Sequence, residues 1–254
     1  MSELILYGAP MSTYVWTARM ACVEKGVPHR LESRRYRRMG ALQSPEHLAL
    51  HPFGKMPAMC HGALVLYETA AICRYVDAAF DGPLLQPTDP AAIGRMEQWI
   101  GVLNAYVYDD LVRRCILQYA FPSGSDGEPN RAVMDRARAN MERDIGVLDA
   151  AYAEGDFLAG GDSPTIADLL AAPILSYFAK TPEGEALMAG PRTSAALSPP
   201  CRRGQALPRP PRPRRPGRRG RPGDRTVTAA QPRIHRTITA GLPRPAIASR
   251  QHGP

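Results

Sequence analysis

The 254-residue sequence has no long hydrophobic run, because no apolar stretch approaches the ~20 residues that a transmembrane helix needs. Its first residues, Met1 to Leu4, lack the basic start and the apolar segment of a secretory signal peptide. From these two absences we expect a protein of the cytoplasm that does not partner with membranes.

Metal-binding and disulfide patterns are also missing from the sequence. The five cysteines show neither a C-x-x-C spacing nor a Cys/His arrangement of the kind that holds zinc. We therefore expect reduced thiols and no bound metal.

Aromatic residues are absent from the last part of the chain. Residues 191–254 contain no Phe, Tyr or Trp, but they contain fifteen arginines, thirteen prolines and a single acidic residue, Asp224. Such a composition buries too little apolar surface to offset chain entropy, so we expect a disordered tail. The net charge of +8 comes from this tail, since residues 1–190 carry more acidic than basic groups.

Two origins of the tail remain open. An arginine-rich arm attracts nucleic acid, but single-strand binders interleave aromatic residues for base stacking, so we do not expect a nucleic-acid partner. Arg, Pro, Ala and Gly all have GC-rich codons, and a frameshift near residues 195–200 of a GC-rich gene would produce this composition. An authentic disordered arm is the alternative.

The first eighty residues alternate short apolar segments with helical ones. We expect a strand, a helix, a strand, a short helix, a hairpin and a helix at about residues 4–6, 12–26, 28–31, 44–50, 57–67 and 69–80. This order is typical of an α+β, thioredoxin-like domain, which we assign to residues 1–80.

The next hundred residues show helical periodicity. Residues 81–88 form a linker rich in turn-forming residues, and Asp89-Pro90 starts a long helix. Its apolar residues recur every three or four positions, at Ile93, Met96, Ile100, Leu103, Val107, Leu111 and Cys115. A second long helix is expected over 131–153, and Thr165 and Asp168 form a capping box. We assign residues 89–190 to an all-α domain and 191–254 to the tail.

Two short motifs describe a binding site for a small zwitterionic peptide. A cis bond between Met56 and Pro57 would direct the N–H and C=O of Met56 outward, where an extended peptide can pair with them. Glu68 and Thr69 place a carboxylate and a hydroxyl beside the unpaired N–H groups of a helix start. The alternative interpretation is a plain β-hairpin followed by an ordinary helix cap.

Four segments together resemble the glutathione S-transferase family, in particular its serine-type, phi/theta-like bacterial members. These segments are Leu6–Thr13 (LYGAPMST), Leu48–Pro57 (LALHPFGKMP), Glu68–Ile72 (ETAAI) and Phe157–Leu169 (FLAGGDSPTIADL). The resemblance covers roughly residues 3–190, in the family's order.

The resemblance implies roles for individual residues. Ser12 would donate its hydroxyl to the thiol of glutathione, and Tyr7 is the rival donor. The other implied substrate-binding residues are Lys55, Met56, Pro57, Glu68, Thr69 and Tyr106. The family usually has a His-Lys pair before Ser44, and this chain has Leu42-Gln43 instead. One charged contact to glutathione is therefore missing, and we expect a reduced affinity unless Gln43 or Lys55 compensates.

The implied function is a homodimeric detoxification enzyme that activates glutathione, its co-substrate, for attack on a hydrophobic electrophile. By position, the electrophile pocket would include Met11, Tyr14, Leu103, Tyr106 and Asp110. The alternative is a non-catalytic protein-interaction module of the same fold, inactive if its last helices are lost.

Overall fold

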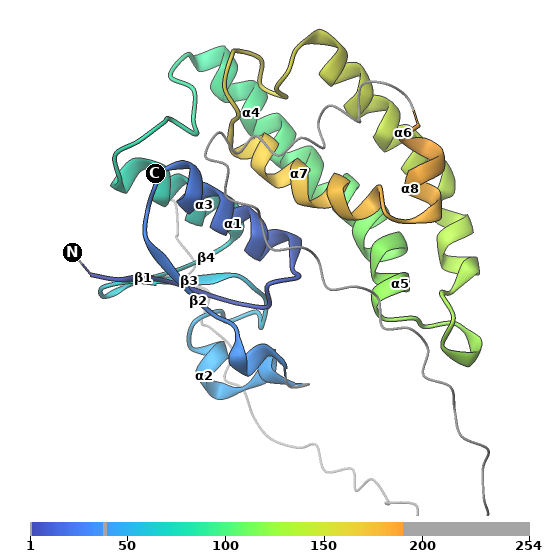
Figure 1. Ribbon diagram of the computed structural model, residues 1–254, viewed down its shortest axis with the longest axis horizontal. Coiled ribbons are helices and arrows are strands. Elements are labelled where there is room, and N and C mark those ends of the chain that lie inside the picture. The colour runs from blue at the N-terminus through green and yellow to red at the C-terminus, as the bar shows by residue number, and fades with distance from the viewer. Residues whose placement is uncertain (1, 38–39, 190–254) are drawn as a thin grey trace, which may run out of the picture. The chain divides into compact units, whose positions relative to one another are not determined.

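The computed structural model describes residues 2–37 and 40–189, so the predicted disordered tail lies outside the described residues. The first part of the chain has the predicted thioredoxin-like order (Figure 1). Its elements are β1 (Leu4–Tyr7), α1 (Thr13–Glu24), β2 (His29–Glu32), η1 (Arg34–Arg37), η2 (Ala41–Gln43), α2 (Pro45–Leu48), β3 (Ala58–His61), β4 (Leu64–Tyr67) and α3 (Thr69–Ala79).

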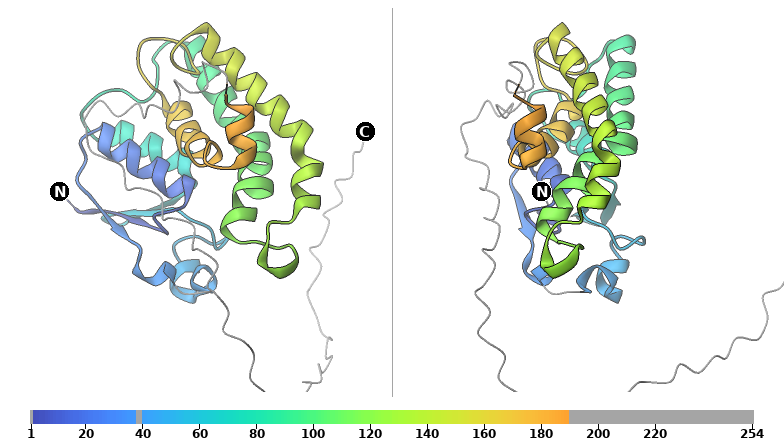
Figure 2. Two further views of the ribbon diagram at one scale, coloured as in Figure 1. Left: turned by 45° about the vertical axis from the view of Figure 1, so that its right-hand side comes forward. Right: turned by 90° about the vertical axis from the view of Figure 1, so that its right-hand side faces the viewer.

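These strands form one four-stranded sheet in the order β2-β1-β3-β4. β1 pairs in parallel with β2 and antiparallel with β3, which pairs antiparallel with β4. Side chains alternate across each strand, so Leu4 and Leu6 enter the core under α1 and α3 while Ile5 and Tyr7 point to the opposite face. Figure 1 and the left view of Figure 2 show α2 on the other side of the sheet from α1 and α3.

The second part of the described chain is helical, which confirms the predicted fold class. Its elements are α4 (Pro90–Val102), η3 (Leu103–Ile116), α5 (Leu117–Ala120), η4 (Ser125–Gly127), α6 (Arg131–Glu154), α7 (Ile166–Phe178) and α8 (Pro182–Leu187). η3 is a π-helix, whereas the sequence predicted one continuous α-helix through this region. Ile93, predicted on the buried face of that helix, is exposed.

One hydrophobic core runs through both parts because α1 and α7 pack against each other. The Thr17 hydroxyl donates a hydrogen bond to the Leu169 carbonyl at 3.1 Å, and the rings of Trp16 and Tyr177 meet edge to face. α1, whose first turn is predicted to bind glutathione, is thereby held against the core helix of the helical part.

No helix in the described part of the chain is long and apolar enough to span a bilayer. The cysteines that the structure describes, Cys22, Cys60, Cys73 and Cys115, are all free thiols.

Candidate functional site

Ser12 caps the N-terminus of α1. Its backbone is extended (φ −68°, ψ 129°), and its Oγ accepts a hydrogen bond from the Val15 N–H at 3.4 Å. The residue is half-buried, and a bond this long holds the oxygen weakly while its own proton stays free to donate. The positive end of α1 lies directly behind the hydroxyl. Ser12 therefore has the surroundings of a donor to an anion.

The loop before α1 makes close contact with the loop before β3. The Ala9 N–H donates to the Met56 Sδ at 3.2 Å. Gly8 has a φ of +156°, and a Cβ atom at this position would lie 2.4 Å from Val15 Cγ2 and 3.2 Å from Met56 Cβ. Glycine at position 8 thus allows the Ser12 cap and the Met56 loop to converge.

The peptide bond between Met56 and Pro57 is cis, as the sequence predicted. Pairing of β3 with both neighbouring strands begins at Ala58, so the N–H and C=O of Met56 lie outside the sheet ladder. These two groups are placed to pair with an extended peptide. Pro57 itself is buried beneath them.

Lys55, next to Met56, is fixed through its backbone by residues that the sequence analysis missed. The Lys55 carbonyl lies 2.6 Å from Nε2 of the buried His47, and Nδ1 of His47 lies 2.7 Å from the Tyr36 hydroxyl. Because a carbonyl only accepts, Nε2 carries a proton and donates it to the Lys55 carbonyl. The ammonium of Lys55 stays exposed for a ligand.

Gln43 is brought beside Lys55 by the turn at Gly54. Gly54 has a φ of +56°, and a Cβ atom there would lie 2.4 Å from Gln43 Nε2 and 2.8 Å from the Leu42 carbonyl oxygen. The 41–43 turn therefore rests directly on the loop that carries Lys55. Gln43 and Lys55 are both exposed.

Glu68 and Thr69 form the start of α3. Glu68 is the N-cap, with φ 70° and ψ 116°, and its side chain does not cap the helix. The first N–H groups of α3 are thus left for a ligand, beside the exposed Glu68 carboxylate and the buried Thr69. His51 and Tyr14 both lie within electrostatic range of Glu68. A carboxylate next to unpaired N–H groups suits a ligand with an ammonium and a carboxylate on one carbon.

Tyr7, the rival donor, occupies a different face of the structure. Strand register places its side chain on the same side of the sheet as Ala58 and Cys60, away from α1. Arg35 lies over its ring at 6.0 Å, while burial and Cys60 raise the pKa of the phenol. The geometry thus favours Ser12, and the role of Tyr7 stays a prediction.

Comparison with protein families accounts for this arrangement. Residues 6–84 match the family model described as the glutathione S-transferase N-terminal domain, and residues 131–202 match the glutathione S-transferase C-terminal domain. Glutathione S-transferase 3 of Zea mays is 31% identical over 175 residues, which make up 66% of this chain and 75% of that protein. The chain belongs to the glutathione S-transferase family.

Solved structures resemble this transferase over most of their length. Glutathione S-transferase III in its apo form superposes with a TM-score of 0.70 and 31% identity, covering 84% of this chain and 100% of that one. Glutathione S-transferase I from maize, in complex with an atrazine glutathione conjugate, has a TM-score of 0.67 and 27% identity, covering 78% and 91%. The C-terminal family match ends at residue 202, inside the predicted tail. The domain boundaries and the frameshift near residues 195–200 stay predictions.

Two residues expected in the electrophile pocket of this transferase lie elsewhere. Leu103 is completely buried in the core. Asp110 is buried against α6, where it accepts from Asn140 at 3.2 Å and pairs with Arg143 at 3.6 Å and with Arg114 at 3.4 Å. The burial of Leu103 and the contacts of Asp110 with α6 keep both side chains from an accessible surface, which their positions in the sequence did not show.

Tyr106 and Tyr108 lie on different sides of η3. Tyr106 is 59% exposed and lies within electrostatic range of Arg143 on α6, and its role in substrate binding stays a prediction. The Tyr108 ring stacks on the Tyr14 ring, with centroids 4.5 Å apart. Tyr108 is therefore the η3 tyrosine that contacts α1. It does so at Tyr14, two residues after Ser12. In the sequence, only the two-residue spacing of Tyr106 and Tyr108 indicated that their side chains would contact different elements.

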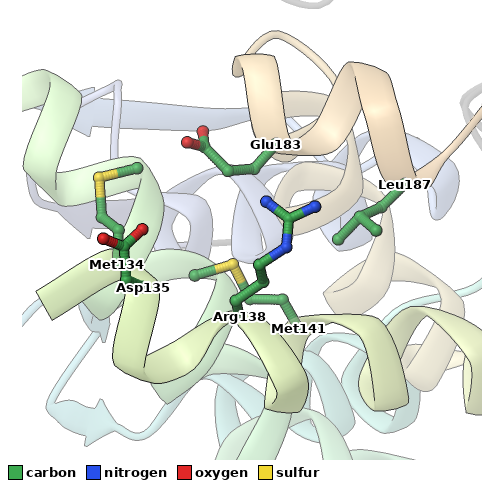
Figure 3. A pocket seen from close by; sticks show the side chains of 6 residues that line it. All are labelled: Met134, Asp135, Arg138, Met141, Glu183 and Leu187. Atoms are coloured by element: carbon green, nitrogen blue, oxygen red, sulfur yellow. The ribbon is translucent and has the colours of Figure 1, made fainter. Parts of the chain in front are cut away.

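A small pocket lies in the helical part of this transferase, away from Ser12. Met134, Asp135, Arg138 and Met141 of α6 and Glu183 and Leu187 of α8 line it. Arg138 points from α6 toward α8, between Glu183 and Leu187 (Figure 3). None of the predicted glutathione-binding residues contributes to this pocket, so it is a packing feature between two helices.

Proposed function

We propose that this protein conjugates glutathione to a hydrophobic electrophile and that Ser12 activates the thiol. The observation that carries the proposal is the half-buried Ser12 hydroxyl, which caps α1. The loop before this cap contacts the side chain of Met56, the residue before the cis Pro57, through the Ala9 N–H. Family membership and the maize enzyme's glutathione conjugate support glutathione as the co-substrate.

Glutathione would lie extended across the three structural features described above. Its cysteinyl backbone pairs with the N–H and C=O of Met56, and its γ-glutamyl ammonium and carboxylate meet Glu68 and the start of α3. The glycyl carboxylate lies toward Lys55 and Gln43. This arrangement places the cysteinyl sulfur between Met56 and Ser12.

The chemistry requires a thiolate at neutral pH. A free thiol with a pKa near 8.5 is only a few per cent ionised there. A hydroxyl donor and a helix N-terminus stabilise the anion, and each unit by which the pKa falls corresponds to about 1.4 kcal/mol. The proton goes to solvent, the sulfur lone pair forms the new bond to the electrophilic carbon, and the leaving group departs with the electrons of the bond that breaks.

The decisive experiment titrates the thiolate absorbance of bound glutathione against pH, for the parent protein and for Ser12→Ala. We expect a bound-thiol pKa about one to two units below the free value, rising again in Ser12→Ala, and a fall in kcat of about a hundredfold. Asn130→Ala is the matched control, because Asn130 caps α6 in the way that Ser12 caps α1. The Asn130 side chain accepts a hydrogen bond from the Val133 N–H, far from the site.

Each result of the titration has a clear meaning. A loss of the shift in Ser12→Ala but not in Asn130→Ala supports thiol activation by Ser12. Binding of glutathione without any shift in the parent protein would instead favour the non-catalytic interaction module. A shift that survives in Ser12→Ala would transfer the role to another donor, with Tyr7 the first to test.

We also propose that the protein is a cytoplasmic homodimer with a detoxification role. β4 is an edge strand, and Leu64, Val65 and Tyr67 on it are exposed, as is the neighbouring Phe53. An exposed apolar edge of this kind is a candidate association surface. The free thiols fit a reducing compartment. Light scattering at several protein concentrations tests the dimer.

A further inference from the structure

The π-helical winding of η3 aligns three side chains toward α1. An α-helix repeats every 3.6 residues, whereas i→i+5 bonding gives roughly 4.4 residues per turn. Steps of four and five residues therefore place Asn104, Tyr108 and Arg113 on one face. π-Helical segments occur frequently at functional sites.

The contacts of this face converge on Tyr14, two residues after Ser12. The Tyr14 hydroxyl donates to the Asn104 Oδ1 at 3.0 Å, and the Tyr14 and Tyr108 rings stack with an interplanar angle of 25°. The guanidinium carbon of Arg113 lies 5.6 Å from the Tyr108 ring centroid. The result is an aromatic pair with a cation over the Tyr108 ring, and Tyr14 of this pair lies two residues after the Ser12 that we propose activates the thiol.

Arg113 keeps most of its hydrogen-bonding capacity for a ligand. Its contact with Asp109 is long, at 4.0 Å, while Arg114 approaches the same carboxylate at 2.7 Å. The Arg113 side chain is 61% exposed. A guanidinium that packs on an aromatic ring and leaves its donors free is suited to bind a carboxylate through two parallel hydrogen bonds.

We infer that this transferase prefers planar aromatic electrophiles that carry an anionic substituent, a refinement that rests on the proposed function. The substrate ring packs against the Tyr14–Tyr108 pair, and Arg113 binds its carboxylate. With a chloroarene, the thiolate sulfur forms a bond to the chlorine-bearing carbon, and chloride leaves with its bonding electrons. Glutathione supplies the nucleophile, so no further reactant is needed.

The test compares two substrates that differ in charge, 4-chloro-3,5-dinitrobenzoate and the neutral 4-chloro-3,5-dinitrobenzamide. The measured quantity is the ratio of their kcat/KM values. We expect the parent protein to favour the benzoate, and Arg113→Gln to lower the ratio about tenfold, as for a lost hydrogen-bonded charge pair. Arg138→Gln on α6 is the matched control, since its side chain is 62% exposed.

The outcomes separate this inference from the Ser12 proposal. A lower ratio in Arg113→Gln, with the parent ratio kept in Arg138→Gln, supports the inference. An unchanged ratio in Arg113→Gln overturns it, as does a parent protein without preference for the benzoate. If the parent turns over neither chloroarene, the inference also fails, and the thiolate titration still decides the role of Ser12 independently.

Discussion

Glu68 is the residue whose backbone departs most clearly from ordinary conformations. It is the only non-glycine residue in the described ranges with a positive φ, 70°. Such a conformation costs on the order of 1–3 kcal/mol and persists only where the surrounding structure imposes it. Its carbonyl accepts from Ile72 at 3.0 Å, which holds the start of α3 in place. Strain at this point fits a residue whose carboxylate must face a ligand.

Replacing Glu68 with Gln should weaken glutathione binding. The substitution keeps the shape but removes the negative charge that we propose pairs with the γ-glutamyl ammonium. Hydrogen bonds to charged groups contribute about 1.5–3 kcal/mol, so KM for glutathione should rise roughly tenfold or more. Steady-state kinetics with glutathione as the varied substrate measures the effect. Glu142→Gln, on an exposed face of α6, should leave KM unchanged, and equal KM values in both variants would contradict the assignment.

At the scale of single elements, α7 depends on the cap at its start. The Asp168 carboxylate accepts from the Thr165 N–H and hydroxyl at 2.8 and 2.9 Å, as the capping box in the sequence predicted. Its second oxygen also accepts from the Leu158 N–H at 2.8 Å, a bond that the sequence did not reveal. Burial raises the pKa of this carboxyl despite these bonds. Asp168 therefore joins the 157–165 loop to the core helix.

Asp168→Ala should destabilise the fold more than an ordinary lost cap. It leaves the N–H groups of Leu158 and Thr165 buried without an acceptor, and each such group costs about 1–3 kcal/mol. We expect the free energy of unfolding to fall by about 2–4 kcal/mol in urea denaturation. Asp168→Asn retains one acceptor oxygen and should lose about half as much. If both variants lose the same free energy of unfolding, the charge of Asp168 stabilises the fold, and its number of acceptor oxygens does not.

η3 shows which part of the site the sequence could predict. The helix start near Ser12, the cis bond at Pro57 and the Glu68-Thr69 start depend on neighbours in the sequence, so local patterns predicted them. Asn104, Tyr108 and Arg113 meet Tyr14 only because η3 is wound wider than an α-helix. Leu103, Val107, Leu111 and Cys115 recur in four-residue steps and are all buried. Such steps also occur on the apolar face of an α-helix, so the sequence alone could not distinguish the two windings.

At the scale of the whole described chain, Leu85 joins the sheet-containing part to the helical part. The sequence predicted residues 81–88 only as a linker. In the structure Leu85 is buried, its N–H donates to the Asp77 carboxylate at 2.9 Å, and its carbonyl accepts from the Ile166 N–H at 3.0 Å. Asp77 also forms a buried ion pair with Lys25 at 3.0 Å. Contacts between residues so far apart in sequence leave no local pattern, so sequence analysis could not find them.

Asp77→Ala should therefore destabilise both parts of the chain together. It leaves the Lys25 ammonium buried without its partner, and breaking such a pair costs about 3–5 kcal/mol. The two tryptophans, Trp16 in α1 and Trp99 in α4, report on the two parts separately, so urea denaturation is followed in Trp99→Phe and Trp16→Phe backgrounds. Because Leu85 couples the parts, the urea concentration at the unfolding midpoint should fall by the same amount whether it is followed by the fluorescence of Trp16 or of Trp99.

Glu97→Ala is the matched control for Asp77→Ala, because Arg74 and Glu97 also link α3 to the helical part but are partly exposed. An exposed pair contributes at most about 1 kcal/mol, so both midpoints should move little. A fall in the Trp16 midpoint alone, with Trp99 unmoved, would show that the two parts unfold independently. In that case the first turn of α1 would not depend on the helical part for its position. Since Tyr14 belongs to α1 and Tyr108 to η3, the stacking of the two rings would then require two independent folding events.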